Sequence, residues 1–173
     1  MIDAEQRKEP RFPGYRESSV REEIKKQLRQ EKTIGDKLTG IAGGACGGDI
    51  LFHELCIELE IPSEIFLALP IDEFRKASVS FAGIEWEQRF ETLIKNLPVH
   101  ILADKKDNSK TGNIWEEANL WMLNTALANG GKNMSLLALW DGKGGDGSGG
   151  TEHMIKVAKE QGAKTKIIDI NQL

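Results

Sequence analysis

One run of small residues that ends in a carboxylate has the composition of a phosphate-binding turn, and its members are Gly43, Gly44, Ala45, Cys46, Gly47, Gly48 and Asp49. Glycine reaches positive φ angles and lets the backbone approach a ligand closely. A helical pattern begins directly after the run, so the N–H groups of a first helical turn and the positive end of the helix dipole would meet an anion. The run therefore predicts an anion site made by backbone amides. A tight strand-to-helix turn is the simpler alternative.

A second glycine-rich stretch extends from Asp141 to Thr151, after an apolar run that ends at Trp140. We expect the Asp141 carboxylate to lie at the mouth of the site, where it could accept a hydrogen bond from a ligand hydroxyl, and we expect a ligand to order residues 142–150. The hydroxyl of Thr151 either caps the next helix or contacts the ligand, and Asp49 faces the same choice in the first run. The predicted ligand contacts of this stretch are Asp141, Gly149, Gly150 and Thr151.

Several other side chains could help to bind a ligand, although packing or solvation explains each of them equally simply. His53 and His153 lie near the starts of the two helices that follow the glycine stretches, and a neutral imidazole could bond a base or a ribose. Further candidates are Trp115 for base stacking, Asn119 for the edge of the base, Arg75 and Arg89 for phosphate, and residues 78–80 for the rim of the site.

Metal and covalent chemistry find little support in the sequence. Asp141 and Glu152 occupy the first and twelfth positions of a calcium-loop count, but Lys143 and Gly145 stand where oxygen ligands are required. Cys46 and Cys56 match neither a zinc spacing nor a disulfide framework, so both are expected to be free thiols. A position at a helix start could lower the pKa of Cys46. We expect no metal and no required cofactor besides the ligand itself.

The elements that carry these residues alternate regularly along the chain. Val20, Ile24 and Leu28 recur at helical spacing after Ser18, which predicts a first helix. Further helices are expected at 49–60, 86–97, 113–129 and 151–161, and strands at 37–42, 64–69, 99–103, 134–140 and 166–170. Apolar strands that alternate with helices predict an α/β fold, a Rossmann-like three-layer sandwich with a mainly parallel sheet and helices on both faces. Ligands of such folds bind beyond the carboxyl ends of the strands, where both glycine stretches fall.

Length and composition are those of one globular domain, with 173 residues of which 39% are hydrophobic and 29% charged. We expect residues 1–17 to form an irregular lead-in and residues 18–173 to form a single Rossmann-like ligand-binding domain. The first helix has no strand before it, which leads us to expect a short strand upstream of Met1.

The formal charge of −4 argues against nucleic-acid polymers and anionic membranes as partners. No apolar run is long enough to cross a bilayer, and the polar N-terminus lacks the core of a signal peptide. We therefore expect a cytoplasmic protein.

The two glycine stretches together resemble the motifs of the SLOG superfamily, which unites Rossmann-like domains of the DNA-processing protein A type with Lonely Guy phosphoribohydrolases. Residues 43–49 resemble its GGAxGxD motif, and Gly149-Gly150-Thr151 resembles its later GGT motif. The resemblance implies a nucleotide or a nucleotide-derived ligand, with a phosphate on the first loop and the second loop closing over the sugar or another phosphate. It also implies a sensor that signals to a fused effector domain or acts as a homodimer.

The hydrolases of that superfamily carry a catalytic glutamate three residues after the threonine, and this chain has Met154 there. The resemblance therefore favours ligand sensing over catalysis. Two alternatives stay open. One is an N-glycosidic hydrolase acting on a nucleoside monophosphate, with Glu152 or Asp141 in the catalytic role. The other is a protein-interaction domain without a ligand.

Overall fold

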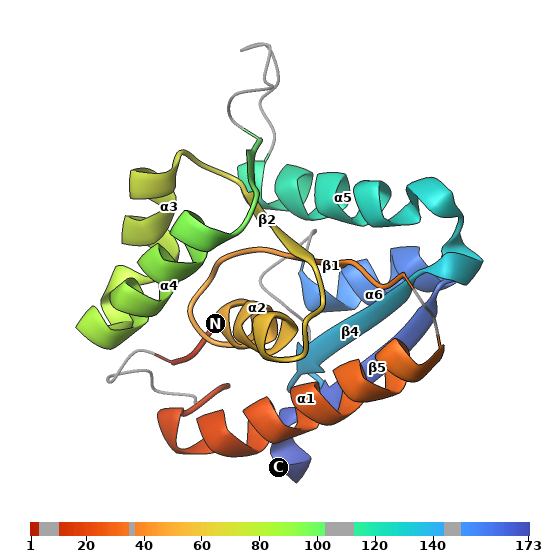
Figure 1. Ribbon diagram of the computed structural model, residues 1–173, viewed down its shortest axis with the longest axis horizontal. Coiled ribbons are helices and arrows are strands. Elements are labelled where there is room, and N and C mark those ends of the chain that lie inside the picture. Colours follow the sequence, from red (N-terminus) through yellow and green to blue (C-terminus); the bar gives the residue numbers. More distant parts are fainter. Residues whose placement is uncertain (4–10, 35–36, 103–112, 144–149) are drawn as a thin grey trace. The chain divides into compact units, whose positions relative to one another are not determined.

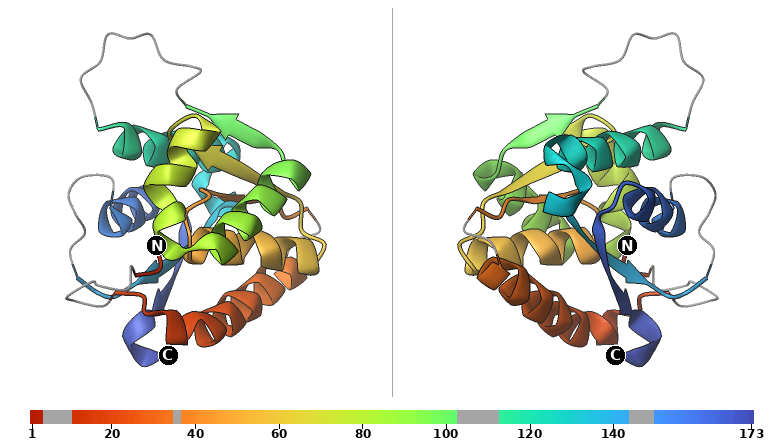
Figure 2. Two further views of the ribbon diagram at one scale, coloured as in Figure 1. Left: turned by 90° about the vertical axis from the view of Figure 1, so that its left-hand side faces the viewer. Right: turned by 90° about the vertical axis from the view of Figure 1, so that its right-hand side faces the viewer.

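The computed structural model describes residues 1–3, 11–34, 37–102, 113–143 and 150–173. Contacts within the chain divide it into two compact units. The first unit contains Met1–Asp104 and Leu173, and the second contains Lys105–Gln172. Figures 1 and 2 show the elements of each unit from three sides.

A three-stranded parallel sheet forms the centre of the first unit. Its strands are β1 (Gly40–Ala42), β2 (Ser63–Leu67) and β3 (Val99–Ile101), in the order β1-β2-β3. Gly40 is opposite Ser63 in the first pair, and Ile65 is opposite Val99 in the second. Because β2 is central, most of its residues are buried, which explains its continuous apolar sequence.

Four helices accompany this sheet, namely α1 (Glu17–Ile34), α2 (Gly48–Glu58), α3 (Ile71–Ser78) and α4 (Ile84–Asn96). Short 3-10 turns, η1 (Gly14–Arg16) and η2 (Ser80–Ala82), precede α1 and α4. The predicted apolar stripe of α1 is confirmed, because Val20, Ile24 and Leu28 are its buried residues. Helix α1 packs against α2, and Figure 2 shows the two helices next to each other. Helix α2 also packs against β1, β2 and α4.

The second unit contains a two-stranded parallel sheet of β4 (Ser135–Trp140) and β5 (Lys164–Asp169). Its helices are α5 (Ile114–Ala126) and α6 (Thr151–Glu160), and its 3-10 turns are η4 (Leu127–Asn129), η5 (Gly131–Asn133) and η6 (Ile170–Gln172). Asn113 caps α5 by accepting a hydrogen bond from the Trp115 amide at 3.1 Å. Helix α6 packs on both strands and on α5. Leu123, Met154 and Ala158 form the buried apolar cluster between the two helices.

This arrangement confirms the predicted fold class, a Rossmann-like α/β fold with parallel sheets flanked by helices. Three details differ from the expectations. The five strands lie in two sheets among the described residues, α3 was not expected, and α1, for which the sequence predicts about three turns, extends to Ile34. No helix of the described part of the chain is long and apolar enough to cross a bilayer.

Candidate functional site

The first glycine loop crosses from the carboxyl end of β1 to the first residue of α2, as its sequence predicts. Gly47 is the N-cap of α2, with φ of 106° and ψ of −124°, a conformation open to glycine alone. Asp49 is therefore the second residue of the helix and not its cap. The loop thus has the predicted place in the fold, at the carboxyl end of a parallel strand.

The glycines of this loop have close neighbours within the protein. A Cβ added to Gly43 would lie 2.6 Å from Oδ2 of Asp49, and one added to Gly44 would lie 2.9 Å from the Phe90 ring. A Cβ added to Gly47 would lie 2.7 Å from the backbone nitrogen of Ile2. Close packing therefore explains three of the four glycines without a ligand, in agreement with the simpler alternative.

Three loop or helix-start amides already have acceptors. Ala45 N–H donates to Oδ2 of Asp49 at 3.2 Å, Cys46 N–H donates to the Ser78 carbonyl at 3.0 Å, and Leu51 N–H donates to the Gly47 carbonyl at 3.0 Å. Ser78 thus meets the loop through its backbone, near the rim expected for residues 78–80.

The first amides of α2 differ from these three. Within the described parts of the chain, the N–H groups of Gly48, Asp49 and Ile50 have no acceptor. These are the first three amides of α2, where unpaired N–H groups and the helix dipole favour an anion. The part of the loop that suits an anion is therefore the first turn of α2 and not the whole run.

His53 holds the start of the glycine loop through its side chain. Its side chain is fully buried, with Nε2 3.0 Å from the Gly43 carbonyl oxygen and Nδ1 3.1 Å from Oγ of Ser63. A carbonyl can only accept, so Nε2 carries the proton and Nδ1 accepts from the Ser63 hydroxyl. Burial lowers the pKa of His53, and the charge of Asp49 offsets this only in part. His53 therefore supports the loop as a neutral side chain whose two ring nitrogens are both bonded within the protein.

Cys46 differs from its expected chemistry. Its side chain is fully buried, and burial raises the pKa of its thiol to about 11, so the lowering that a helix start could cause does not occur. Cys56 is also buried, and burial raises its pKa to about 12. Both cysteines are free thiols, as predicted.

The second glycine stretch begins in the second unit with a local turn. Oδ1 of Asp141 accepts a hydrogen bond from the Lys143 amide at 3.1 Å, and the Asp141 carbonyl accepts one from the Asn171 side chain at 2.8 Å. Asp141 is buried, so its carboxylate also has a structural reason to be there. The contact predicted for Gly149 and most of the loop expected to order on binding, residues 144–149, lie outside the described residues.

The start of α6 bears on the catalytic alternative. Thr151 is the first helical residue, and Gly150 before it is the N-cap without a side-chain hydrogen bond, so Thr151 does not cap the helix. Glu152 lies in the first turn, whereas Met154 is buried with Leu123 and Ala158. The position that matches the hydrolase glutamate is thus part of an apolar core.

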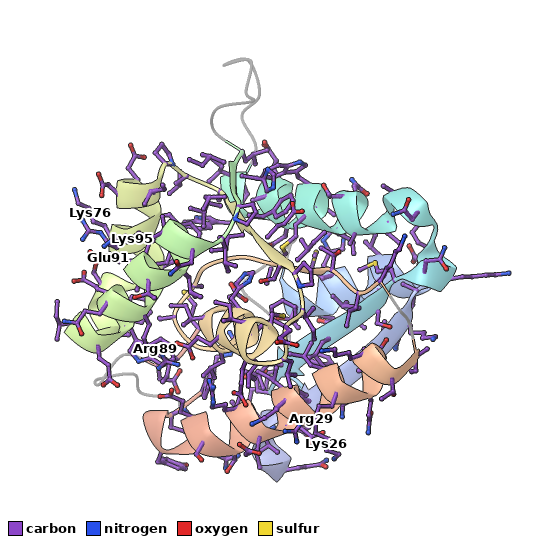
Figure 3. All side chains as sticks on the ribbon, viewed as in Figure 1. Lys26, Arg29, Lys76, Arg89, Glu91 and Lys95 are labelled. Carbon is purple, nitrogen blue, oxygen red and sulfur yellow. The ribbon has the colours of Figure 1, made fainter. Side chains whose placement is uncertain are left out.

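The two arginines considered for phosphate have carboxylate partners instead. Arg89 lies on α4 (Figure 3). It donates to Glu54 through Nε and Nη2 at 2.7 and 2.8 Å, and to Glu17 through Nη1 at 2.7 Å. Arg75 pairs with Asp72 at 3.3 Å and with Glu91 at 3.4 Å. Neither guanidinium is therefore free for a ligand.

Sequence reasoning missed the neighbours that complete the first loop. Ile2 and Phe12 of the supposed lead-in are buried, and Ile2 N–H donates to the Cys46 carbonyl at 2.9 Å. Two apolar residues in a polar segment were the available signal.

Comparisons with known proteins add no constraint on this site. No family model, curated protein or solved structure matches the chain. The described residues contain no cluster of three or more histidine, cysteine or carboxylate side chains that could hold a metal ion.

Proposed function

We propose that the first unit binds a phosphate group of a nucleotide or nucleotide-derived molecule at the start of α2, and that the protein is a ligand-dependent regulatory module. The observation that carries the proposal is the set of three N–H groups at Gly48, Asp49 and Ile50 that have no acceptor among the described residues. They follow a glycine loop at the carboxyl end of a parallel strand, the usual place for ligands in such folds.

The Asp49 carboxylate narrows the proposed contacts. Its Oδ2 atom accepts a hydrogen bond from the Ala45 amide. The carboxylate would repel a second anion at that amide. The phosphate therefore contacts the first turn of α2, while Asp49 can accept a ligand hydroxyl through its other oxygen. Asp141, Gly149, Gly150 and Thr151 stay predicted contacts of the second glycine stretch.

Sensing has more support than hydrolysis of an N-glycosidic bond. The buried Met154 supplies no carboxylate at the position of the hydrolase glutamate. Glu152 and Asp141 remain the candidates for the catalytic role in that alternative, and Asp141 is bonded to its own turn.

Calorimetric titration with nucleoside mono-, di- and triphosphates and with cyclic mono- and dinucleotides tests the proposal. Gly48→Pro removes one of the three amides at the first helical position, where proline is well tolerated. We expect Gly48→Pro to weaken binding about tenfold, or ~1.4 kcal/mol.

The matched control is Gly48→Ala, which adds a side chain but keeps the amide and should bind nearly as the natural protein does. Circular dichroism of both variants reports the fold. Chromatography of the titrated mixtures should return the nucleotide intact, whereas free base would favour the hydrolase alternative. Absence of heat with every nucleotide would refute the proposed function.

A further inference from the structure

The connection between α5 and β4, residues 127–133, contains the one asparagine of the chain that is followed by glycine. Asn129 is the last residue of η4, and Gly130 follows it with φ of 88°, a conformation that favours glycine. Both residues are exposed to solvent. This pair belongs to the second unit and is separate from the candidate anion site on α2.

The side chain of Asn129 is held by no hydrogen bond among the described residues, and only its backbone carbonyl accepts one, from the Asn133 side chain at 2.8 Å. Other asparagines differ in this respect. The side-chain amides of Asn96, Asn133 and Asn171 donate to backbone carbonyls at 2.7 to 2.8 Å, and the Asn113 side chain caps α5. The Asn129 side chain can therefore turn towards the backbone nitrogen of the next residue.

That nitrogen, of Gly130, is protected by a single short-range bond. Its N–H donates to the Leu127 carbonyl at 2.8 Å within a 3-10 turn at the end of a helix. Such bonds have poorer geometry than α-helical ones, and helix ends fray. A Cβ added to Gly130 would have no atom within 4 Å, so no neighbour crowds this side of the residue. Opening of one bond thus exposes the nitrogen to the Asn129 side chain.

We propose that Asn129 is a site of spontaneous modification, where deamidation and isomerisation lengthen the α5–β4 connection and loosen the second unit. The Gly130 nitrogen attacks Cγ of Asn129, the new N–Cγ bond replaces the Cγ–Nδ2 bond, and Nδ2 leaves as ammonia with the proton of the attacking nitrogen. Water then opens the resulting succinimide ring at either carbonyl. The products are aspartate and isoaspartate, and in isoaspartate the main chain runs through Cβ and Cγ.

The connection has little room for the isoaspartate product. A Cβ added to Gly131 would overlap the Gln161 carbonyl oxygen and lie 3.1 Å from the Ala163 nitrogen, so an extra main-chain carbon before Gly131 cannot be taken up on that side. The Lys164 amide donates to the Met134 carbonyl at 3.0 Å and aligns the starts of β4 and β5 just beyond. The new carboxylate also lies at the C-terminal end of a helix, where the helix dipole disfavours negative charge.

Incubation of the full chain at mildly alkaline pH, followed by peptide mass mapping of each asparagine, tests the reaction. Asn124 is the internal control, because it is also exposed and without a side-chain hydrogen bond among the described residues, but it precedes Thr125 inside α5. We expect Asn129 to convert at least about tenfold faster than Asn124, since glycine lets the nitrogen approach Cγ. Enzymatic methylation of isoaspartate identifies the isomerised product. Equal rates at the two positions would overturn the site.

Amide hydrogen exchange in β4 and β5 tests the loosening. We expect exchange there to be about tenfold faster in the incubated natural chain than in the fresh one. Asn129→Gln keeps a side-chain amide but closes the ring far more slowly, so its exchange should not change on incubation. Equal exchange in the incubated natural chain and the incubated variant would overturn the loosening.

Asn129→Asp, measured fresh, introduces the charge without the extra main-chain carbon. We expect its exchange to lie between those of the fresh and the incubated natural chain. Exchange as fast as in the incubated chain would assign the whole effect to charge and overturn the lengthened connection as its cause.

Discussion

The buried His53 side chain makes the stability of the protein depend on pH. Burial lowers the pKa of His53 below the ordinary value of 6.5, so the unfolded chain takes up a proton at a higher pH than the folded chain does. Stability from this residue is complete above pH 6.5 and falls as the pH drops towards the folded-state pKa. Denaturation by urea between pH 7.5 and 5.5 should show a loss of up to ~1.4 kcal/mol per pH unit from this group.

His53→Gln is the comparison that isolates this effect. A glutamine amide can donate to the Gly43 carbonyl and accept from Ser63, but it does not titrate. We expect the slope of stability against pH to be shallower in the variant. His100 and His153 are present in both proteins, so an identical slope would show that His53 is not its source.

The sequence predicted the position of the glycine loop but not the contacts that its residues make. The glycine loop and the start of α2 could be located from the sequence because both signals are local. The reason why positions 44 and 47 need glycine could not be predicted, because their neighbours Phe90 and Ile2 are distant in the chain. The raised pKa of Cys46 could not be predicted for the same reason, because the burial that raises it comes from folding.

At the scale of elements, an ionic network joins α1, α2 and α4 within the first unit. Arg89 makes two hydrogen bonds to Glu54 and one to Glu17. Its guanidinium carbon lies 4.0 Å from the centroid of the Trp86 ring, and its side chain is only 19% exposed. Bonds to charged groups of this kind contribute about 1.5–3 kcal/mol. We expect Arg89→Ala to lower the free energy of unfolding by about 2 kcal/mol in urea denaturation.

Arg75→Ala is the matched control for that experiment. Its partners Asp72 and Glu91 are 81% and 50% exposed, and the bonds are longer, so the loss should stay below ~1 kcal/mol. Equal losses in the two variants would contradict a special role for the Arg89 network.

Most elements were predictable because their apolar spacing is regular over several turns. Helix α3 was missed since eight residues with Ile71 and Phe74 as large apolar positions are too few to show a helical period. The far end of α1 is polar and is held by tertiary contacts, among them a bond from Lys32 to the Leu59 carbonyl at 2.5 Å.

At the scale of the whole molecule, the two compact units make separate predictions possible. Met154→Glu places a carboxylate in the apolar cluster of the second unit and should cost about 3 kcal/mol there. We expect amide hydrogen exchange to quicken in β4, β5 and α6, while β1, β2 and β3 keep their protection. Lys156→Glu, at an exposed position of the same helix, should leave exchange in both units unchanged.

Faster exchange in all five strands would instead mean that the units unfold together, as the predicted single domain over residues 18–173 would. The sequence pattern could not decide between these outcomes. Alternation of strands and helices predicts parallel pairing. The division into two units depends on contacts between residues distant in the chain, which no local sequence pattern predicts.

The division between the units, after Asp104, also has a consequence for biosynthesis. All three strands of the first sheet precede it, so their pairing needs nothing that is translated later. Ribosomes add roughly 5–20 residues per second, and domains fold as they emerge. The glycine loop and its supporting histidine can therefore assemble during translation, seconds before β4 and β5 leave the exit tunnel.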